Sequence, residues 1–509
     1  MLFSSFGFIF VFLPLALAGF HAAAWVGRRP AAIWLVLVSL GFYAYWKISL
    51  LPLLLISIAF NFGISRAISA AAQQPRLQSG LLTFGIAADV LALIYYKYLA
   101  AFLGFLSAQG IATFHASDII LPLGISFFTF TQIGYLIDVK QDVAKTRDLL
   151  SYVLFVTFFP HLIAGPILHN REMMPQFADP ATYRFSRSNL AVGLMIFSIG
   201  LAKKTVLADS LSGDVAAGFA AAGASGAAAA WYAVMAYSLQ LYFDFSGYSD
   251  MAIGLARMFN VKFPLNFNSP YKAETVIDYW QRFHMTLTRF ITMYIFSPIA
   301  LAITRRRMAR SLDTSRRASA TLGGFTSLIM TPTLITMGLA GIWHGAGLNY
   351  LIFGLLHGFY IVINHGARIF FPQPKKPPPR PAAQAWLIHA WKVLAVYVAA
   401  LVAFCFFRAA STMDAFDLLA GMAGLHGAGQ AVPWISCMWM AILLAIVWIT
   451  PNSQQIMSQF EPALGKPPTN PITWTVWRPT PKWAGICGIL LAAGILGIGQ
   501  TMEFLYFQF

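Results

Sequence analysis

Charged residues are scarce in this sequence: Asp, Glu, Lys and Arg make up 10% of its 509 residues, against about 25% in an ordinary soluble domain. Apolar residues make up 58%. This composition excludes both a soluble globular protein and a disordered one. Cysteine is scarce as well, and the three present, Cys405, Cys437 and Cys487, lie within or beside apolar runs. So low and odd a number excludes a secreted scaffold held together by disulfides.

Several motifs of well-known enzymes and transporters are missing too. Neither His344 nor His357 has a nearby HExxH or CxxC partner, so no metal site is expected. The sequence has no GxxxxGK[ST] loop for phosphate, and Ser126 does not stand in a GxSxG elbow. It also lacks an internal repeat with paired interrupted helices, the pattern of many secondary transporters.

Long apolar stretches run almost from one end of the chain to the other, separated by short polar breaks. Crossing a bilayer core about 30 Å thick takes roughly 20 apolar residues in a helix. The sequence therefore predicts an all-α polytopic membrane protein with roughly 11–14 membrane segments, and membrane lipid as its surroundings.

The basic residues predict how these segments are oriented. Arg28 and Arg29 follow the first apolar run, and short cytoplasmic loops collect Lys and Arg, so the N-terminus is expected outside. The arginine-rich loop at 305–317 and a Pro-rich linker at 372–385 are expected to be cytoplasmic. The formal net charge of +16 then comes mostly from basic residues retained in cytoplasmic loops. Because the basic residues are scattered among short loops, no nucleic-acid partner is expected.

One apolar run, residues 149–167, is predicted to be broken or re-entrant. Pro160 and Pro166 lie within it, and each proline removes a hydrogen bond from a helix. A full crossing would also leave the following basic residues on the outer side. Broken helices at membrane depth usually line a cavity, so His161, beside Pro160, is a candidate lining residue.

Polar residues gather in two places within the apolar sequence, where each one needs a partner or a function. The first cluster includes Asp244, Asp250, Trp280, Arg282 and His284. Its two aspartates lie on an otherwise membrane-like stretch, and Arg282 and His284 follow in a short polar segment. We expect these side chains to meet in one buried network, either as paired ions that fix a broken-helix region or with a direct catalytic role.

The second cluster is the run 341–347, which contains Trp343 and His344 between glycines, with Asn349 close behind. Glycines beside a histidine allow another backbone or a ligand to approach closely. His344 lies near the turn between two predicted spans whose other ends are cytoplasmic, so it is expected deep in the membrane or toward the outer face. An imidazole there suits a general base acting on an acceptor hydroxyl.

Taken together, these motifs resemble the membrane-bound O-acyltransferase family, in its alginate O-acetylation branch. The matching blocks span most of the chain: LPLGISFFTF at 121–130, FPHLIAGPI at 159–167, YFDFSGYSDMAIG at 242–254, WQRFH at 280–284 and GIWHG at 341–345. The resemblance implies a helical bundle with re-entrant or broken helices around a central tunnel. It also implies that His344 matches the family's active-site histidine and that His284 matches its second histidine or asparagine position.

The resemblance further implies the reaction. No cofactor would be bound; an acyl thioester, acetyl-CoA or an acyl-carrier protein, would be the co-substrate on the cytoplasmic side. The acyl group would pass outward to an exported polysaccharide, often through a periplasmic acyltransferase partner. The chain departs from this branch at Thr292 and Met293, where relatives usually carry Arg and Asp.

The resulting hypothesis is an acyltransferase of the bacterial inner membrane, with His344 as base and His284 assisting. Trp280, Trp343, Asn349 and the charged network would line the tunnel or hold its structure. We expect one integral membrane domain over 1–509, with N-terminal helices at 1–118, a catalytic core at 119–371, the linker at 372–385 and C-terminal helices at 386–509.

Other functions remain open from the sequence. Transfer of D-alanine to a teichoic-acid-like polymer would use the same thioester chemistry. A transporter would also carry intramembrane Asp, Arg and His. A non-catalytic scaffold that docks a periplasmic acyltransferase is the third alternative, because Thr292 and Met293 replace the usual Arg and Asp.

Overall fold

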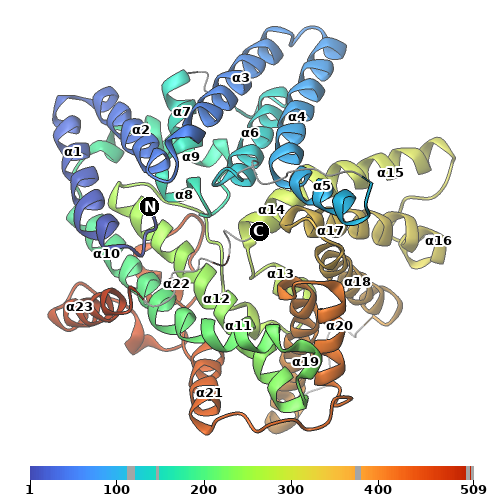
Figure 1. The fold of residues 1–509 in the computed structure, drawn as a ribbon. Coiled ribbons are helices and arrows are strands. Elements are labelled where there is room, and N and C mark those ends of the chain that lie inside the picture. The colour runs from blue at the N-terminus through green and yellow to red at the C-terminus, as the bar shows by residue number, and fades with distance from the viewer. Residues whose placement is uncertain (112–120, 145–147, 373–379, 500–504, 506–509) are drawn as a thin grey trace. The chain divides into compact units, whose positions relative to one another are not determined.

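The computed structural model describes residues 1–111, 121–144, 148–372, 380–499 and 505. Within these ranges the regular structure is helical, and no β-strand is present, which confirms the all-α prediction (Figure 1). The chain divides into two compact units. Unit 1 contains Met1–Val206, Asp244–Leu265 and Ser453–Gln508, and unit 2 contains Leu207–Phe243 and Asn266–Asn452.

Unit 1 contains the N-terminal helices, the last part of α12 and two helices from the C-terminal region. Its helices are α1 (Leu13–Val26), α2 (Arg28–Ala44), α3 (Leu51–Ala70), α4 (Pro75–Lys97), α5 (Leu99–Ala108), α6 (Ile125–Lys140), α7 (Leu149–Thr157), α8 (Phe159–Leu162), α9 (Asn170–Ala178), α10 (Arg187–Ala202), α22 (Ser453–Ile456) and α23 (Pro481–Leu496).

Unit 2 begins with α11 and the first part of the 32-residue helix α12 and ends with α21. Its helices are α11 (Ser212–Ala220), α12 (Ala227–Met258), α13 (Val276–Trp280), α14 (Met285–Ile291), α15 (Ser297–Ala309), α16 (Leu322–Phe325), α17 (Thr331–His344), α18 (Leu348–Phe370), α19 (Ala382–Arg408), α20 (Thr412–Met422) and α21 (Trp434–Ile449).

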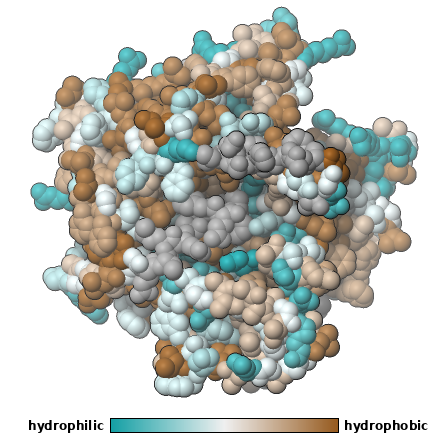
Figure 2. Space-filling model, in the orientation of Figure 1, coloured by the Kyte–Doolittle hydropathy of each residue, from teal (hydrophilic) through white to brown (hydrophobic). Residues whose placement is uncertain are grey.

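Among the described residues, eight helical stretches are long and apolar enough to cross a membrane: Phe8–Val26, Ile48–Ala70, Pro75–Lys97, Arg187–Ala220, Met285–Ala309, Leu322–His344, Leu348–Phe370 and Ala382–Arg408. The apolar helices α21 and α23 are shorter. Much of the surface visible in Figure 2 is apolar, as expected of side chains that face lipid. The protein is therefore a multi-pass membrane protein.

This number is below the 11–14 segments expected from hydropathy, because several apolar runs do not form one long helix. The run 81–106 is divided at Tyr98 into α4 and α5. Helix α2 has 17 residues, fewer than the roughly 20 that a helix needs to cross a bilayer core. Most of the Pro-rich linker expected at 372–385 lies outside the described residues, and α19 begins near its end, at Ala382.

The run 149–167 is broken, as its prolines predict. Asp148 caps the start of α7 by accepting a 2.9 Å hydrogen bond from the backbone N–H of Ser151, which lowers the pKa of its carboxyl. Helix α7 ends at Thr157, and Pro160 stands in the first turn of the short helix α8. Proline has no backbone N–H, and it is tolerated in a first turn because the N–H groups there have no acceptor within the helix.

Glycine allows α10 and α12 to pack closely within unit 1. A Cβ atom added to Gly247 would lie 2.7 Å from the carbonyl oxygen of Gly200, and one on Gly254 would lie 2.6 Å from that of Gly193. Larger residues would force the helices apart. This contact brings the C-terminal end of α10, with Lys203 just beyond it, against the part of α12 that carries the aspartates.

Helices α17 and α18 form a second close pair, in unit 2, on either side of the short connection 345–347. Their contact is made by Gly341 and Gly354, and a Cβ atom on Gly354 would lie 2.8 Å from the Cα atom of Gly341 and would overlap the carbonyl oxygen of Met337. The pair fixes where α17 ends, and α17 ends at His344.

Replacing Gly354 by Ala should therefore disturb this helix pair. Separation of the helices is expected to cost about 1–3 kcal/mol and to lower any activity that depends on His344. Thermal unfolding in detergent and an acyl-transfer assay would measure both effects. Gly338→Ala is the matched control, because its Cβ atom would make ordinary contacts with the side chains of Leu355 and Leu351, at 3.4 and 3.7 Å. Equal behaviour of the two variants would contradict the assigned role of Gly354.

Candidate active site

His344 is the last residue of α17, and 7% of its surface is exposed. Three aromatic rings contact its imidazole edge-on. The centroids of Trp343, Phe407 and Phe353 lie 4.9, 5.0 and 5.9 Å from that of His344. The sequence-predicted Trp343 is thus part of an aromatic wall around the histidine. Phe353 and Phe407 come from α18 and α19, so three helices enclose the imidazole.

The helix end also affects the charge that His344 can carry. The last carbonyl groups of a helix have no partner within it and carry a partial negative charge. A cation near this end is stabilised by about 0.3–1 kcal/mol at an exposed site. His344 is the last residue of α17, so it lies beside these carbonyl groups.

His284 directly precedes α14 and is almost completely buried. Its backbone is in the left-handed region, with φ 46° and ψ 51°. Its Nδ1 lies 3.0 Å from Oδ1 of Asn266, which is itself buried. The same oxygen accepts hydrogen bonds from the hydroxyl and the backbone N–H of Thr286, at 2.8 and 3.3 Å.

These contacts identify which nitrogen of His284 carries a proton. The backbone N–H of Thr286 can only donate, so the Asn266 atom that it meets is the amide oxygen. That oxygen can only accept, and Nδ1 of His284 must therefore donate. In the neutral imidazole the basic lone pair is then on Nε2. Asn266 lies 18 residues before His284 in the same polar stretch, and the sequence did not indicate that the two side chains are bonded.

Replacing Asn266 by Ala should destabilise this arrangement, because three donors lose one acceptor. Loss of buried hydrogen bonds of this kind costs about 1–3 kcal/mol. If His284 assists catalysis, transfer should also fall by about tenfold or more. Thermal unfolding and initial rates would measure these effects. Asn268→Ala is the control, since the Asn268 amide oxygen accepts from Asn452 rather than from a histidine. A fully active Asn266→Ala protein would argue against a role for His284.

Trp280 is joined to the surroundings of His344 through His357. The indole N–H of Trp280 donates to Nδ1 of His357 at 3.3 Å. His357, which is 1% exposed, packs edge-on against Phe353, the ring that also contacts His344. Unit 2 therefore brings Trp280 and His344 into one aromatic and histidine-rich region. His357 was noted in the sequence only by its spacing from His344.

Arg282, which the sequence analysis grouped with Asp244 and Asp250, has an ion-pair partner within its own segment of unit 2. Arg282 forms an ion pair with Asp278 one helical turn earlier, 2.8 Å from its Nε. Both side chains are about one-third exposed. Because a partner lies at i−4 on the same short segment, Arg282 is satisfied locally.

The two aspartates of α12 are paired with adjacent lysines in unit 1. Lys204 Nζ lies 2.6 Å from Oδ1 of Asp244, and Lys203 Nζ lies 2.8 Å from Oδ2 of Asp250. Sequence analysis missed both lysines. They stand at the end of an apolar run, where a basic pair is expected to mark the edge of a span.

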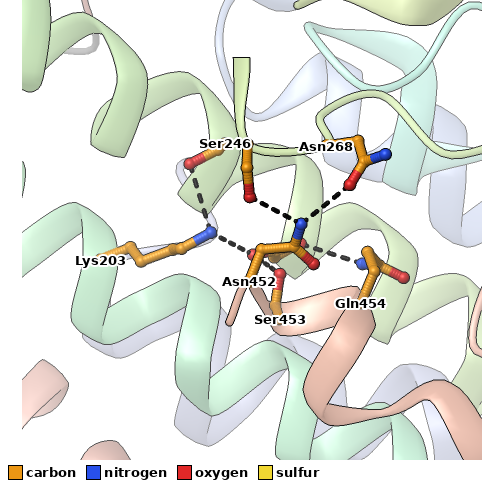
Figure 3. Close-up of polar contacts among 8 residues, drawn as sticks. Lys203, Ser246, Asn268, Asn452, Ser453 and Gln454 are labelled. Carbon is orange, nitrogen blue, oxygen red and sulfur yellow. Dashed lines mark hydrogen bonds and ion pairs between the residues drawn. The ribbon is translucent and has the colours of Figure 1, made fainter. Parts of the chain in front are cut away.

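Asp250 has further partners from a distant part of the chain, Ser453 and Gln454, which are labelled in Figure 3 together with Lys203. Ser453 donates to its Oδ2 at 2.7 Å, and the side chain of Gln454 donates to its Oδ1 at 3.2 Å. Lys203 also donates to the hydroxyl of Ser246 at 3.3 Å. Both oxygens of the carboxylate thus have partners, and Asp250 holds α12 to α22 within unit 1.

The side chains of His161 and Asn349 also donate hydrogen bonds to backbone carbonyl groups near the ends of helices. Nε2 of the buried His161 donates to the carbonyl oxygen of Phe155 in α7, at 2.8 Å, and so satisfies a carbonyl near the proline break. Asn349, at the start of α18, donates to the carbonyl oxygens of Phe406 and Ala409 at 3.2 Å, where α19 ends. Both contacts stabilise the fold.

Comparison with known proteins shows the family of this chain. The model of the family described as MBOAT, membrane-bound O-acyltransferase, matches residues 99–314. The chain is 38% identical to the peptidoglycan O-acetyltransferase of Helicobacter pylori, over 84% of this chain and 80% of that protein. The chain belongs to the membrane-bound O-acyltransferase family. The resemblance seen in the sequence motifs is therefore confirmed, and the protein is an acyltransferase.

Two further relatives show the breadth of this membrane-bound O-acyltransferase group. A probable alginate O-acetylase of Azotobacter vinelandii is 35% identical, over 72% of this chain and 70% of the relative. A teichoic acid D-alanyltransferase of Bacillus subtilis is 27% identical, over 47% of this chain and 58% of the relative. Different acyl groups and acceptors thus occur among its relatives.

Proposed function

We propose that this membrane-bound O-acyltransferase moves an acetyl or similar short acyl group from a cytoplasmic thioester to a hydroxyl of an exported polysaccharide, or to a partner acyltransferase that completes the transfer. The observation that carries the proposal is His344, a buried imidazole at the end of α17 within an aromatic wall. The names of the relatives support the acceptor class, since they act on peptidoglycan and alginate.

In the proposed reaction His344 takes the proton of the acceptor hydroxyl as its oxygen attacks the thioester carbonyl. The carbon–sulfur bond then breaks, an ester forms, and the proton passes to the departing thiolate. The aromatic wall excludes water, which would otherwise hydrolyse the thioester. His284, held by Asn266, would assist or orient a substrate.

Radiolabelled acetyl-CoA, purified protein in lipid and an acceptor polysaccharide would test this function. We expect label on the polysaccharide, or on a periplasmic partner acyltransferase when one is added. Absence of transfer from both acetyl-CoA and an acetylated carrier protein, with folded protein present, would contradict the proposal.

D-alanyl transfer is the second candidate, supported by the teichoic acid D-alanyltransferase relative. A D-alanyl thioester of a carrier protein would then replace acetyl-CoA as donor in the same assay. Family membership favours both transferase reactions over the transporter and scaffold alternatives.

We also propose that the protein lies in the inner membrane with its N-terminus outside. The arginines Arg28 and Arg29, at the start of α2 and just after α1, support this orientation, because basic residues near the ends of spans are retained on the cytoplasmic side. An N-terminal epitope should then be accessible to antibody on intact spheroplasts. Access only after permeabilisation would reverse the orientation.

A further inference from the structure

Two buried polar side chains of unit 1, Asp89 on α4 and Asn61 on α3, are bonded to each other. The amide nitrogen of Asn61 donates to Oδ1 of Asp89 at 2.8 Å. Asp89 is 5% exposed and Asn61 is completely buried. Asp89 stands 14 residues after Pro75, the first residue of α4, which is about 20 Å along the helix. Its carboxyl group thus lies well inside a membrane-spanning helix, where an ionisable side chain needs an explanation.

The carboxyl group of Asp89 lies where three helices meet. Helices α3 and α4 run side by side, and both pack against α6 (Figure 1). The buried residues of α4 are Gly85, Asp89 and Leu93, one turn apart on one face. A Cβ atom on Gly85 would lie 2.8 Å from the side chain of Leu136 in α6 and 3.0 Å from that of Ile64 in α3. So close a packing leaves the carboxyl group little access to water.

The hydrogen bonds of this pair leave two oxygen atoms without partners. The amide nitrogen of Asn61 also donates to the carbonyl oxygen of Ser57, at 3.1 Å. A carbonyl can only accept, which identifies the nitrogen and hence the oxygen of the Asn61 amide. That oxygen, Oδ1, and Oδ2 of Asp89 are both buried without a hydrogen-bond partner among the described residues. If Asp89 were ionised, both would be acceptors with no hydrogen to share.

Neighbouring polar groups do not supply the missing hydrogen. The side-chain nitrogen of Gln132 in α6 donates to the hydroxyl of Ser57 at 2.8 Å, and its oxygen accepts from the hydroxyl of Tyr152 at 3.1 Å. The hydroxyl of Ser65 donates to a carbonyl of its own helix, α3, at 2.7 Å. Each of these donors is therefore bonded to an acceptor other than Asp89.

Cationic side chains of these helices stand near the membrane edges rather than beside Asp89. All of those on α3, α4 and α6 lie within the first or last five residues of their helix. They are Arg66, Arg76, Lys97 and Lys140. Lys140 donates to Ser79, near the start of α4, at 2.9 Å. Among the described ion pairs none includes Asp89, so an ionised carboxylate there would be buried without a counter-charge.

A metal ion does not fit this place either. Over the part of the chain that the structure describes, no group of three or more His, Cys, Asp or Glu side chains could hold one. The two free oxygens are also fewer than the four or more ligands that zinc, calcium or magnesium takes in proteins. A single proton, in contrast, is enough for both oxygens.

We propose that Asp89 binds a proton in the folded protein, and that the resulting carboxylic acid pairs with the carboxamide of Asn61. Oδ2 of Asp89 then donates to Oδ1 of Asn61, while Oδ1 of Asp89 continues to accept from the amide nitrogen. Each group supplies a donor and an acceptor, so both free oxygens gain a partner. No charge remains between the helices. This proton site ties α3 to α4 within unit 1 and does not depend on the proposed function.

Infrared spectroscopy of the protein in lipid nanodiscs, near neutral pH, tests for the proton directly. The carbonyl stretch of a protonated carboxyl group is separate from the bands of carboxylates and amides. The spectrum of the wild type minus that of Asp89→Asn should therefore contain one protonated carboxyl band. An ionised Asp89, joined to Asn61 through a trapped water molecule, would give carboxylate bands in this difference and would overturn the inference.

Thermal unfolding of the same variant provides an independent test. Asparagine is neutral and offers an N–H where the acid offers an O–H, so Asp89→Asn should shift the unfolding temperature by less than about 1 °C. Asp250→Asn is the matched control, because its carboxylate lies 2.8 Å from Lys203. That variant should unfold about 2 °C lower or more, since a partly buried lysine loses its counter-charge. A rise of several degrees for Asp89→Asn, or its failure to fold, would also overturn the inference.

Asn61→Leu tests the partner of the proton. Without the carboxamide the carboxyl band should remain but move to higher frequency, because the carbonyl of Asp89 no longer accepts a hydrogen bond. The unfolding temperature should fall by about 1–3 °C, the effect of losing two buried hydrogen bonds in a protein of this size. A band at the wild-type position would contradict the pairing with Asn61.

Discussion

His344→Ala is expected to lose acyl transfer by about 10²- to 10⁴-fold, the range that a positioned general base contributes. The imidazole is the ionisable group at the end of α17, and alanine cannot take the proton of the acceptor hydroxyl. Loss of the ring also leaves a gap between Trp343, Phe353 and Phe407, so some loss of stability should accompany the kinetic effect. Initial rates with labelled thioester would measure the first effect, and thermal unfolding the second.

Two controls separate chemistry from packing in this experiment. His344→Gln fills much of the same space without a basic nitrogen, so it should be as inactive as His344→Ala but better folded. His389→Ala removes a half-exposed histidine that pairs with Glu274 on the surface of unit 2, and it should retain activity. Transfer by His344→Ala at the wild-type rate would refute the assignment of the base.

Lys204→Met is expected to destabilise the protein by about 3–5 kcal/mol, the cost of leaving a buried charge without its partner. Both members of the Lys204–Asp244 pair are almost fully buried, at 4% and 2% side-chain exposure. Without Lys204, the partner left to the carboxylate among the described residues is the backbone N–H of Leu505, at 3.3 Å. We expect a small yield of folded protein after detergent extraction and a large fall in the unfolding temperature.

A second substitution should reverse most of this loss. In Lys204→Met with Asp244→Asn, the charge is gone and the amide oxygen still accepts from Leu505. Lys203→Met should cost less than Lys204→Met, because Asp250 retains Ser453 and Gln454 as donors. If the double variant were no more stable than Lys204→Met alone, an unpaired carboxylate would not be the cause.

Features encoded by local sequence were predictable. Apolar composition set the all-α membrane class, and Pro160 and Pro166 predicted the break in the run 149–167. The glycines around His344 marked it as a candidate site. Each of these conclusions depends on neighbouring residues, since helix formation and helix breaking act over one or two turns.

Partners from distant parts of the chain were not predictable in the same way. Nothing local indicates that Asp250 is bonded by Ser453 and Gln454, about 200 residues later. Arg282 was grouped with Asp244 and Asp250, although Asp278 stands four residues before it and is its ion-pair partner. The i, i+4 spacing of Asp278 and Arg282 is the signal that would have found the pair.

The left-handed backbone of His284 limits which amino acids can replace it. At φ 46° a side chain with an ordinary Cβ atom is strained, and Asn, Asp and His are the residues that tolerate this region best after glycine. Exchange between histidine and asparagine at this position can thus be understood from conformation as well as chemistry. Few amino acids are therefore suited to this position, and an exchange among His, Asn and Asp would leave the path of the chain into α14 intact.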